Sequence, residues 1–439
     1  MADDTTHWGP TRRALLGWSA GVGTLSTWGC STLSTPADTM GAETKSELDE
    51  ILSDLTDQSG RFQPISTEEK KARQQRCAEV LQKNHVDALL MEAGSTMDYL
   101  CDVSWGKSER LFALILLADG NAFWISPAFE APRAQEYIEK GNGPVGELIT
   151  WDEHQYAWSP LAEELRRRDV ARIAIEPRAR AFAAQMLAEE FGPERVVSGQ
   201  GVVRDLRGKK DEHELALLRA VNELTQEAIL KVSERLRPGM TDYDLGRWVR
   251  RAQERLGLRG VWVLPLLGET AAYPHGRPEG RSLTSGDLIL VDTGGSLHGY
   301  QSDNTRTWIF DGQPTSEIER GWNAVRDAQR TAFDVMKPGL PCRAIDSAAR
   351  NVLARAGYGR GYENFAHRLG HGIGMDGHEE PYLDGGNELL LEPGMTFSDE
   401  PGIYLPGKYG IRLEDIVVVT EDGADHFGEW QANPTSPSA

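Results

Sequence analysis

The chain has 439 residues, 39% of them hydrophobic and 26% charged, which is enough for two ordinary domains with separate cores. Its formal net charge of −20 argues against nucleic acid or an anionic membrane surface as a partner. Short peptides, whose own charges largely cancel, are not excluded.

The first sixty residues differ in kind from the rest. The run TRRALL at residues 11–16 precedes a weakly apolar stretch that ends at Gly29. This pattern is typical of a twin-arginine export signal, so we expect a periplasmic or cell-envelope protein. Cys30 is a candidate lipid-anchor site, and residues 38–60, acidic and rich in Ser and Thr, are interpreted as a tether. The alternative is a disordered leader without targeting value.

Residues 61–203 are predicted to form an α/β domain. Ser66 and Glu69 make a capping-box pattern at the start of a charged amphipathic helix that runs through Gln82. Five apolar segments then read as strands that alternate with helical stretches. These segments are DALLMEA, LFALILLADG, NAFWIS, GELITW and RIAIEP.

A second domain is predicted over residues 204–430, followed by a flexible tail at 431–439. It opens with a long amphipathic helix in GKKDEHELALLRAVNELTQEAILKVSERL. The tetrapeptides RPGM at 237–240 and KPGL at 337–340 each lie between two helical patterns that lead into a hairpin. Such a duplicated unit would place corresponding residues about a pseudo-twofold axis.

Each of the two hairpins carries a pair of carboxylates. In the first, the apolar run 288–291 delivers Asp292, a Gly-rich turn follows, and the strand ending in 305–310 carries Asp303. In the second, Glu400 leaves a short strand, Gly402 and residues 406–410 form the turn, and Glu414 opens the next strand. Paired strands can aim two carboxylates at one point.

These carboxylates favour a metal site over ordinary solvated turn residues. Asp292 and Glu400 emerge from segments that look buried, where an unpaired carboxylate is costly. Four carboxylates and a histidine suit two hard or borderline divalent ions. Manganese is the expected metal, with cobalt, zinc and iron as alternatives.

The histidine of this set comes from HRLGHGIGMDGHEEP, which contains His367, His371 and His378. The pair at i and i+4 has the spacing of helical zinc peptidases, but Arg368 stands where their catalytic Glu would be. Four glycines also argue against a helix. We therefore predict a tightly turned, extended segment that brings His371 to metal and leaves its neighbours for substrate.

Four segments in order resemble the motifs of the pita-bread metallopeptidases, over about residues 204–427. They are AAYPHG, VDTGGSLHGYQSDNTRTW, HRLGHGIGMDGHEEPYL and EPGMTFSDEPGIYLPGKYGIRLEDIVVVTEDG. Within that superfamily the chain most resembles the Xaa-Pro peptidases, prolidase and aminopeptidase P. The resemblance implies an α/β (α+β) fold class, with a pita-bread catalytic domain behind a creatinase/prolidase-like N-terminal α/β domain, and a homodimer.

The resemblance also implies roles for the metal ligands. Asp292 would bind one metal, Asp303 and Glu414 would bridge both, and His371 and Glu400 would bind the second. A bridging hydroxide would attack the scissile carbonyl of a short proline-containing peptide, with Glu400 as proton shuttle.

Five further residues receive roles from the same resemblance. His378 would hydrogen-bond the developing oxyanion, and His275 and His367 would line the part of the cleft that holds the proline. Arg412 and Tyr404 would orient the metal ligands. The aromatic residues Tyr99 and Trp105 would either approach a neighbouring active site or pack within their own domain.

Asp399 departs from the family pattern, in which this position is more often apolar. Strand alternation predicts that its side chain points away from the metals, because Glu400 follows it directly. Two rival functions remain: metal-independent creatinase-like C–N hydrolysis and a non-catalytic peptide-binding homologue. Both predict lost ligands, whereas all five are present. The choice between dipeptidase and aminopeptidase stays open.

Overall fold

The structure is a computed structural model that describes residues 47–277 and 280–438. The predicted export signal and Cys30 lie outside the described residues. Within the described ranges, no helix combines the length and the apolar character that crossing a bilayer requires. Residues from Ile51 onward belong to one compact unit, which holds two successive folded domains.

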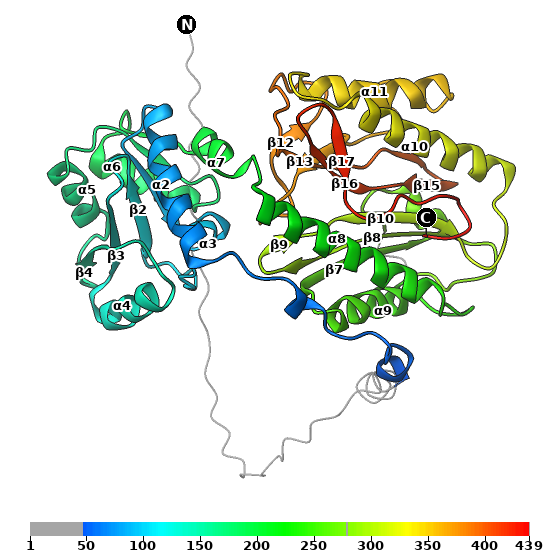
Figure 1. Cartoon of the computed structure of the whole chain (residues 1–439), viewed down its shortest axis with the longest axis horizontal. Coiled ribbons are helices and arrows are strands. Elements are labelled where there is room, and N and C mark those ends of the chain that lie inside the picture. The colour runs from blue at the N-terminus through cyan, green and yellow to red at the C-terminus, as the bar shows by residue number, and fades with distance from the viewer. Residues whose placement is uncertain (1–46, 278–279, 439) are drawn as a thin grey trace, which may run out of the picture. The chain divides into compact units, whose positions relative to one another are not determined.

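A six-stranded sheet forms the centre of the N-terminal domain (Figure 1). Its order is β4-β3-β2-β1-β5-β6, and β1 pairs antiparallel with β2 and parallel with β5. The five predicted strands are confirmed, whereas the three-residue β6 is too short to show a pattern in sequence. The strands are β1 (Ala88–Glu92), β2 (Ala113–Leu117), β3 (Ala122–Pro127), β4 (Gly146–Trp151), β5 (Ile173–Ile175) and β6 (Val196–Ser198).

Helices cover both faces of this sheet because its strands are apolar on both sides. Leu89 of β1 packs with helix α2, and Leu90 packs with α5 and α6 on the opposite face. The predicted capping box at Ser66 is present and starts α2. The helices are α2 (Thr67–Lys83), α3 (Ser95–Leu100), α4 (Ala131–Lys140), α5 (Trp158–Arg167), α6 (Ala181–Phe191) and α7 (Gln200–Arg207).

Helix α7 moves the predicted domain boundary. A boundary at 203/204 cuts through it, and Val202 and Leu206 of α7 both pack into the core that contains α2. The N-terminal domain therefore continues through α7. Tyr99 is 1% exposed in α3, so this residue packs within its own domain. Trp105 stacks on Phe112 with ring centroids 4.2 Å apart.

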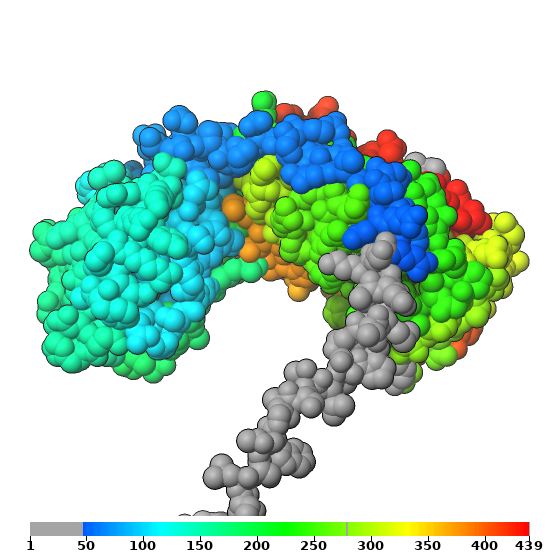
Figure 2. Space-filling view, turned by 90° about the horizontal axis from the view of Figure 1, so that it is seen from below, coloured from blue at the N-terminus to red at the C-terminus, as the bar shows by residue number. Residues whose placement is uncertain are grey.

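The stretch ahead of α2 is attached to the second domain. Arg255 donates to the carbonyl of Leu55, and the Gln58 amide donates to the carbonyl of Leu256. Figure 2 shows this stretch, in blue, on the surface beside the green segments that it contacts. The predicted tether, residues 38–60, therefore includes residues that are hydrogen-bonded to the second domain.

Two helix pairs frame the sheets of the second domain, and they repeat the same turn. Gly239 and Gly339 have φ values of 87° and 83°, which glycine adopts without strain. The Gly239 amide donates to Leu283, and the Gly339 amide donates to Leu391. The predicted repeat therefore extends to backbone geometry. The helices are α8 (Glu212–Ser233), α9 (Asp242–Arg255), α10 (Ser316–Val335) and α11 (Cys342–Arg355).

Three sheets lie among these helices, in the orders β10-β8-β7, β12-β11-β13-β16-β17 and β14-β15, with β9 paired to β8. A bridge between Thr305 and Glu414 joins the first two sheets. The first contains β7 (Arg259–Leu267), β8 (Leu288–Leu297), β9 (Tyr300–Gln301) and β10 (Asn304–Ile309). The others contain β11 (Gly370–Gly372), β12 (Glu379–Leu383), β13 (Thr396–Asp399), β14 (Gly402–Leu405), β15 (Tyr409–Arg412), β16 (Asp415–Val419) and β17 (Ala424–His426).

Three glycines predicted to form turns lie in strands. Gly294 belongs to β8, and a Cβ there would lie 1.9 Å from the carbonyl oxygen of Ser302. Gly402 and Gly410 belong to β14 and β15, and a Cβ on Gly410 would lie 1.8 Å from the Ala271 oxygen. Gly294 and Gly410 therefore permit close backbone approach, which sequence alone does not distinguish from a turn.

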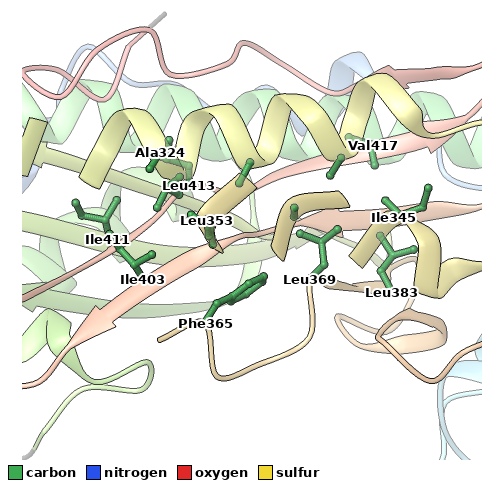
Figure 3. Close-up of a cluster of buried hydrophobic side chains, with 14 of the residues drawn as sticks. Ala324, Ile345, Leu353, Phe365, Leu369, Leu383, Ile403, Ile411, Leu413 and Val417 are labelled. Atoms are coloured by element: carbon green, nitrogen blue, oxygen red, sulfur yellow. The ribbon is translucent and has the colours of Figure 1, made fainter. Parts of the chain in front are cut away.

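One apolar cluster joins the helices α10 and α11 to the strands beneath them (Figure 3). Leu353 of α11, Phe365 and Ile411 of β15 belong to it, each at most 2% exposed. The cluster also includes Leu369, which directly precedes β11 and its His371, and Leu413, which directly precedes Glu414. Packing in this core therefore fixes where those segments lie.

The predicted flexible tail at 431–439 is wrong for the residues that the structure describes. Gln431 is 3% exposed, and its side chain accepts from the Thr307 amide at 3.1 Å and donates to the Thr307 carbonyl at 2.8 Å. The Ile309 amide donates to the carbonyl of Pro434. Strand β10 is an edge strand, and the tail satisfies its free backbone groups.

Candidate active site

The five predicted metal ligands come from both large sheets of the second domain. Asp292 lies within β8, and Asp303 precedes β10. His371 lies in β11, whose extended form confirms that the histidine motif is not helical. Glu400 follows β13 and Glu414 precedes β16. Because Thr305 bridges to Glu414, the two sheets bring the carboxylates of both hairpins together.

Three overlapping groups of these side chains could each hold a cation. Within each group the ligand atoms all lie within 4.8 Å of one another. The groups together contain all five predicted ligands, so the structure assembles the complete set in one place. They are Asp292, Asp303 and Glu414; His371, Glu400 and Glu414; and Asp303, His371 and His378.

His371 presents one ring nitrogen to the carboxylates. Its Nε2 lies 3.6 Å from Asp303 and 3.5 Å from Glu400, and its Nδ1 lies 3.1 Å from the carbonyl oxygen of Gly372. A proton on Nδ1 that points to this carbonyl leaves the Nε2 lone pair for a metal. Burial, with the neighbouring His378, lowers the pKa of His371 to about 3. The neutral, ligating form is thus favoured.

The carboxylates crowd one another in a buried site. Burial raises the pKa of Glu400 to about 8, although Arg412 opposes the change. Burial and the neighbouring carboxylates raise the pKa values of Asp303 and Glu414 well above the ordinary range. Oδ1 of Asp292 is buried and has no hydrogen-bond partner among the described residues. Divalent cations would offset this repulsion and occupy the unused oxygens, so the donor set fits such ions.

Arg412 connects several of these groups while being only 3% exposed. Its Nη2 donates to Asp292 at 2.6 Å, its Nη1 to the Tyr404 hydroxyl at 2.8 Å, and its Nε to Thr305 at 3.1 Å. The Thr305 hydroxyl donates to Glu414 at 2.6 Å. Arg412 therefore fixes the orientation of one ligand directly and of another through Thr305.

His367 and Tyr404 form a pair beside Glu400. The His367 Nε2 lies 2.7 Å from the Tyr404 hydroxyl oxygen, and its Nδ1 lies 3.8 Å from Glu400. Burial and the charge of Arg412 lower the pKa of His367 to about 3. A neutral imidazole at this position adds no charge to the site.

His378 and His275 lie nearer to solvent than the ligands. The His378 ring stacks on the His371 ring with centroids 3.8 Å apart, and the His378 residue is exposed. The exposed His275 lies within electrostatic reach, since its charge contributes to lowering the pKa of both His367 and His378. Both are therefore more exposed to solvent than the five predicted metal ligands.

Asp399 stays outside the three ligand groups, as strand alternation predicted. It lies opposite Asp415 in the β13–β16 pair and is fully buried. Neither of its carboxylate oxygens has a hydrogen-bond partner among the described residues. Burial, with Asp415 and Glu400, raises its pKa well above the usual range, which favours the neutral form.

Sequence reasoning missed two residues that hold the ligands in place. The Ser398 hydroxyl accepts from the His371 amide at 3.0 Å and donates to Glu400 at 3.2 Å. Thr305 connects Arg412 to Glu414, as described above. Sequence did contain a signal for both residues, because side chains two positions apart in a strand lie on the same face. Ser398 lies two residues before Glu400, and Thr305 lies two residues after Asp303.

Comparison with known families agrees with this geometry. The profile described as "Metallopeptidase family M24" matches residues 216–421, which contain all five ligands. The profile described as "Creatinase/Prolidase N-terminal domain" matches residues 73–208, which end with α7. The predicted two-domain architecture, creatinase-like followed by pita-bread, is thereby confirmed.

Individual relatives extend the match along both domains. A "Probable dipeptidase PepE" of Mycobacterium tuberculosis is 37% identical over 338 residues, covering 76% of this chain and 88% of the relative. An "Xaa-Pro dipeptidase" of Lactobacillus delbrueckii subsp. lactis is 34% identical over 357 residues, covering 79% and 94%. The crystal structure of dipeptidase PepE from Mycobacterium ulcerans superposes with a TM-score of 0.78 at 33% identity, covering 85% and 99%. With this family match and the assembled ligand set, the chain belongs to metallopeptidase family M24.

Proposed function

We propose that this M24 metallopeptidase hydrolyses the bond between an N-terminal residue and proline in short peptides, as an Xaa-Pro dipeptidase or aminopeptidase. The observation that carries the proposal is the convergence of four carboxylates and a histidine, with ligand atoms within 4.8 Å in each group. The names of two relatives, a dipeptidase and an Xaa-Pro dipeptidase, support the substrate class.

The ligand set would hold two divalent ions, with manganese first and cobalt, zinc or iron as alternatives. When bound, such ions supply a water of lowered pKa as nucleophile and polarise the scissile carbonyl. The residues that would hold them are Asp292, Asp303, His371, Glu400 and Glu414. The bridging role of Asp303 and Glu414 is supported because each shares one ligand group with Asp292 and another with His371.

The surrounding side chains would transfer the proton, stabilise the oxyanion and position the substrate and the ligands. Glu400 would move the proton from water to the leaving nitrogen, since its carboxylate lies in one ligand group with His371 and Glu414. His378 would hydrogen-bond the developing oxyanion from the open side of the site. His275 and His367 would line the space for proline, and Arg412 and Tyr404 would keep Asp292 and His367 oriented.

A metal-restoration assay tests the proposal. Purified protein is stripped with a chelator and supplied with Mn²⁺, Co²⁺ or Zn²⁺, and hydrolysis of an Xaa-Pro dipeptide is compared with that of an Xaa-Pro tripeptide. We expect activity that depends on metal, and the preferred length separates dipeptidase from aminopeptidase. Metal binding without hydrolysis of either peptide would contradict the proposal. Activity of the fully stripped protein on other C–N bonds would favour the creatinase-like alternative.

Matched variants make the assay specific to the site. Asp303→Ala removes a ligand and should abolish activity together with stoichiometric metal binding. Asp327→Ala, on the surface of α10 and paired with its neighbour Arg326, should retain both. Equal loss in the two variants would show that the effect does not come from the metal site.

Two further parts of the proposal concern assembly and location. We propose a homodimer, which sedimentation velocity would detect as a species of twice 48.5 kDa. We also propose export through the twin-arginine signal, with Cys30 as the candidate lipid anchor. Retention of an Arg12→Lys/Arg13→Lys protein inside the cell would support export, and an unchanged distribution would refute it. Cys30→Ser should release the protein from membranes if the anchor exists.

A further inference from the structure

The loop that carries His378 is held by charged side chains of the N-terminal domain. This loop, residues 374–380, covers most of the connection between β11 and β12 and the first two residues of β12. Arg207, the last residue of α7, is 4% exposed in its side chain and donates to Asp376 at 2.9 Å and to Glu379 at 2.6 Å. These two acidic residues bracket His378 in sequence, so one guanidinium holds both ends of the turn.

Arg207 is itself fixed by other residues of its domain. Its second amino group donates to the hydroxyls of Ser95 and Thr96, both at 3.0 Å. The Ser95 hydroxyl in turn donates to Asp376 at 2.7 Å, and the Thr96 hydroxyl donates to Glu176 at 2.9 Å. Both amino groups of Arg207 therefore have defined partners, which favours a single loop position.

A second arginine contacts the His378 backbone directly. Nη2 of Arg178 donates to the carbonyl of His378 at 2.7 Å, and its Nη1 lies 3.2 Å from Asp376. The Arg178 amide donates to Glu176 at 2.8 Å. Because Glu176 also accepts from Thr96, which contacts Arg207, it links the hydrogen bonds of the two arginines. The carbonyl of His378 is thus tied to the domain that supplies no metal ligand.

Charge pairing holds the loop on this side, and Met375 of the loop adds apolar packing against the core of the N-terminal domain. A cavity of about 270 Å³ lies beside it, lined mainly by charged and polar side chains that include Arg178, Arg204 and Glu380. On the other side, Lys210 donates to Glu379 at 2.7 Å. Burial opposes ionisation of Glu379, but Lys210 and Arg207 outweigh it and hold its pKa below the ordinary value. The acid remains charged and available for both partners.

We infer that Arg178 and Arg207 are positioning residues, through which the N-terminal domain keeps the His378 imidazole stacked on His371 and aimed at the substrate. The inference rests on the proposed function of His378. It gives the N-terminal domain a role in catalysis within the same chain, because a loop that moves by about 1 Å would cost roughly 100-fold in rate.

The test uses Arg178→Met, because the Arg178 side chain is 53% exposed and its loss should leave the fold intact. Arg219→Met is the matched control: Arg219 also donates to a histidine carbonyl, that of His426 at 2.8 Å, and to the adjacent Asp425 at 2.6 Å. With saturating Mn²⁺, we expect kcat for an Xaa-Pro dipeptide to fall about 10- to 100-fold in Arg178→Met, with KM little changed. Arg178→Lys should restore part of kcat, and Arg219→Met should match the wild type.

Hydrogen exchange supplies a readout that does not depend on activity. Amides of residues 374–380 should exchange faster in Arg178→Met and in Arg207→Met than in Arg219→Met, while Mn²⁺ stoichiometry stays the same. Unchanged exchange in Arg178→Met, or a kcat equal to that of the control, would overturn the inference. If the wild type hydrolyses no Xaa-Pro peptide, the proposed function fails, and the exchange comparison alone decides whether the arginines hold the loop. If Arg207→Met does not fold, Arg178→Met still decides the outcome.

Discussion

The buried carboxylate cluster makes the stability of metal-free protein depend on pH in an unusual direction. Burial raises the pKa of Glu400 from 4.5 to about 8, so the folded protein retains a proton that the unfolded chain has already lost. Stability supplied by this proton is complete below pH 4.5 and is lost as the pH rises through 8. The opposite shifts of His367 and His371, from 6.5 to about 3, act only below pH 6.5.

The window from pH 6.5 to 8 therefore lies above the range in which His367 and His371 change the stability. At about 1.4 kcal/mol per pH unit, Glu400 alone should remove about 2 kcal/mol over this interval. Asp303 and Glu414 have pKa values raised by the same burial and crowding, so they act in the same direction. For a domain of this size the loss corresponds to a decrease in Tm of roughly 4 to 8 °C.

Calorimetry of chelated protein at pH 6.5, 7.2 and 8 measures this decrease. Saturating Mn²⁺ should abolish it, because the cations favour the ionised carboxylates at all three pH values. Glu400→Gln should reduce the decrease in Tm, since Asp303 and Glu414 remain, whereas Glu392→Gln, at an exposed acid paired with Lys209, should leave it unchanged. A Tm of metal-free wild type that is constant or rises between pH 6.5 and 8 would refute the reasoning.

Three further predictions concern the scaffold of the site. Arg306→Met should lower the free energy of unfolding by about 3 to 5 kcal/mol in denaturant, because it leaves the buried Asp415 without its partner at 2.7 Å. The double variant Arg306→Met/Asp415→Leu should regain part of this stability. Fully additive losses would argue against the ion pair. Gly410→Ala should lower Tm clearly, since its Cβ would lie 1.8 Å from the Ala271 oxygen, whereas Gly60→Ala meets no atom within 4 Å; equal Tm values would contradict this. Leu369→Ala should cost about 2 to 5 kcal/mol in the same unfolding assay as a fully buried core truncation, and the exposed Leu390→Ala less than about 0.5 kcal/mol; similar costs for both would show that the cluster does not govern stability.

Local pattern was sufficient for most of the N-terminal domain and for proposing the five metal ligands that the structure brings together. The capping box at Ser66 and the short apolar runs of the strands depend only on residues near in sequence. Sequence reasoning therefore located α2 and five of the six strands. The ligands were recognisable because carboxylates directly after apolar runs, as at Asp292 and Glu400, are rare without a compensating charge. The same reasoning placed Asp399 away from the site.

Other features required the tertiary structure, because they depend on contacts between segments distant in sequence. Gly294 and Gly410 look like turn residues until the carbonyls of Ser302 and Ala271 are seen to occupy the space of a Cβ. The sequence predicts a flexible tail around Gln431, but in the structure this tail is hydrogen-bonded to the edge of β10, more than 120 residues away in sequence. Residue chemistry along the chain therefore determined which groups could be proposed as metal ligands. Only the packing of the two domains decided how Arg178 and Arg207 reach the His378 loop, since ion pairs between distant segments leave no periodic signal in sequence.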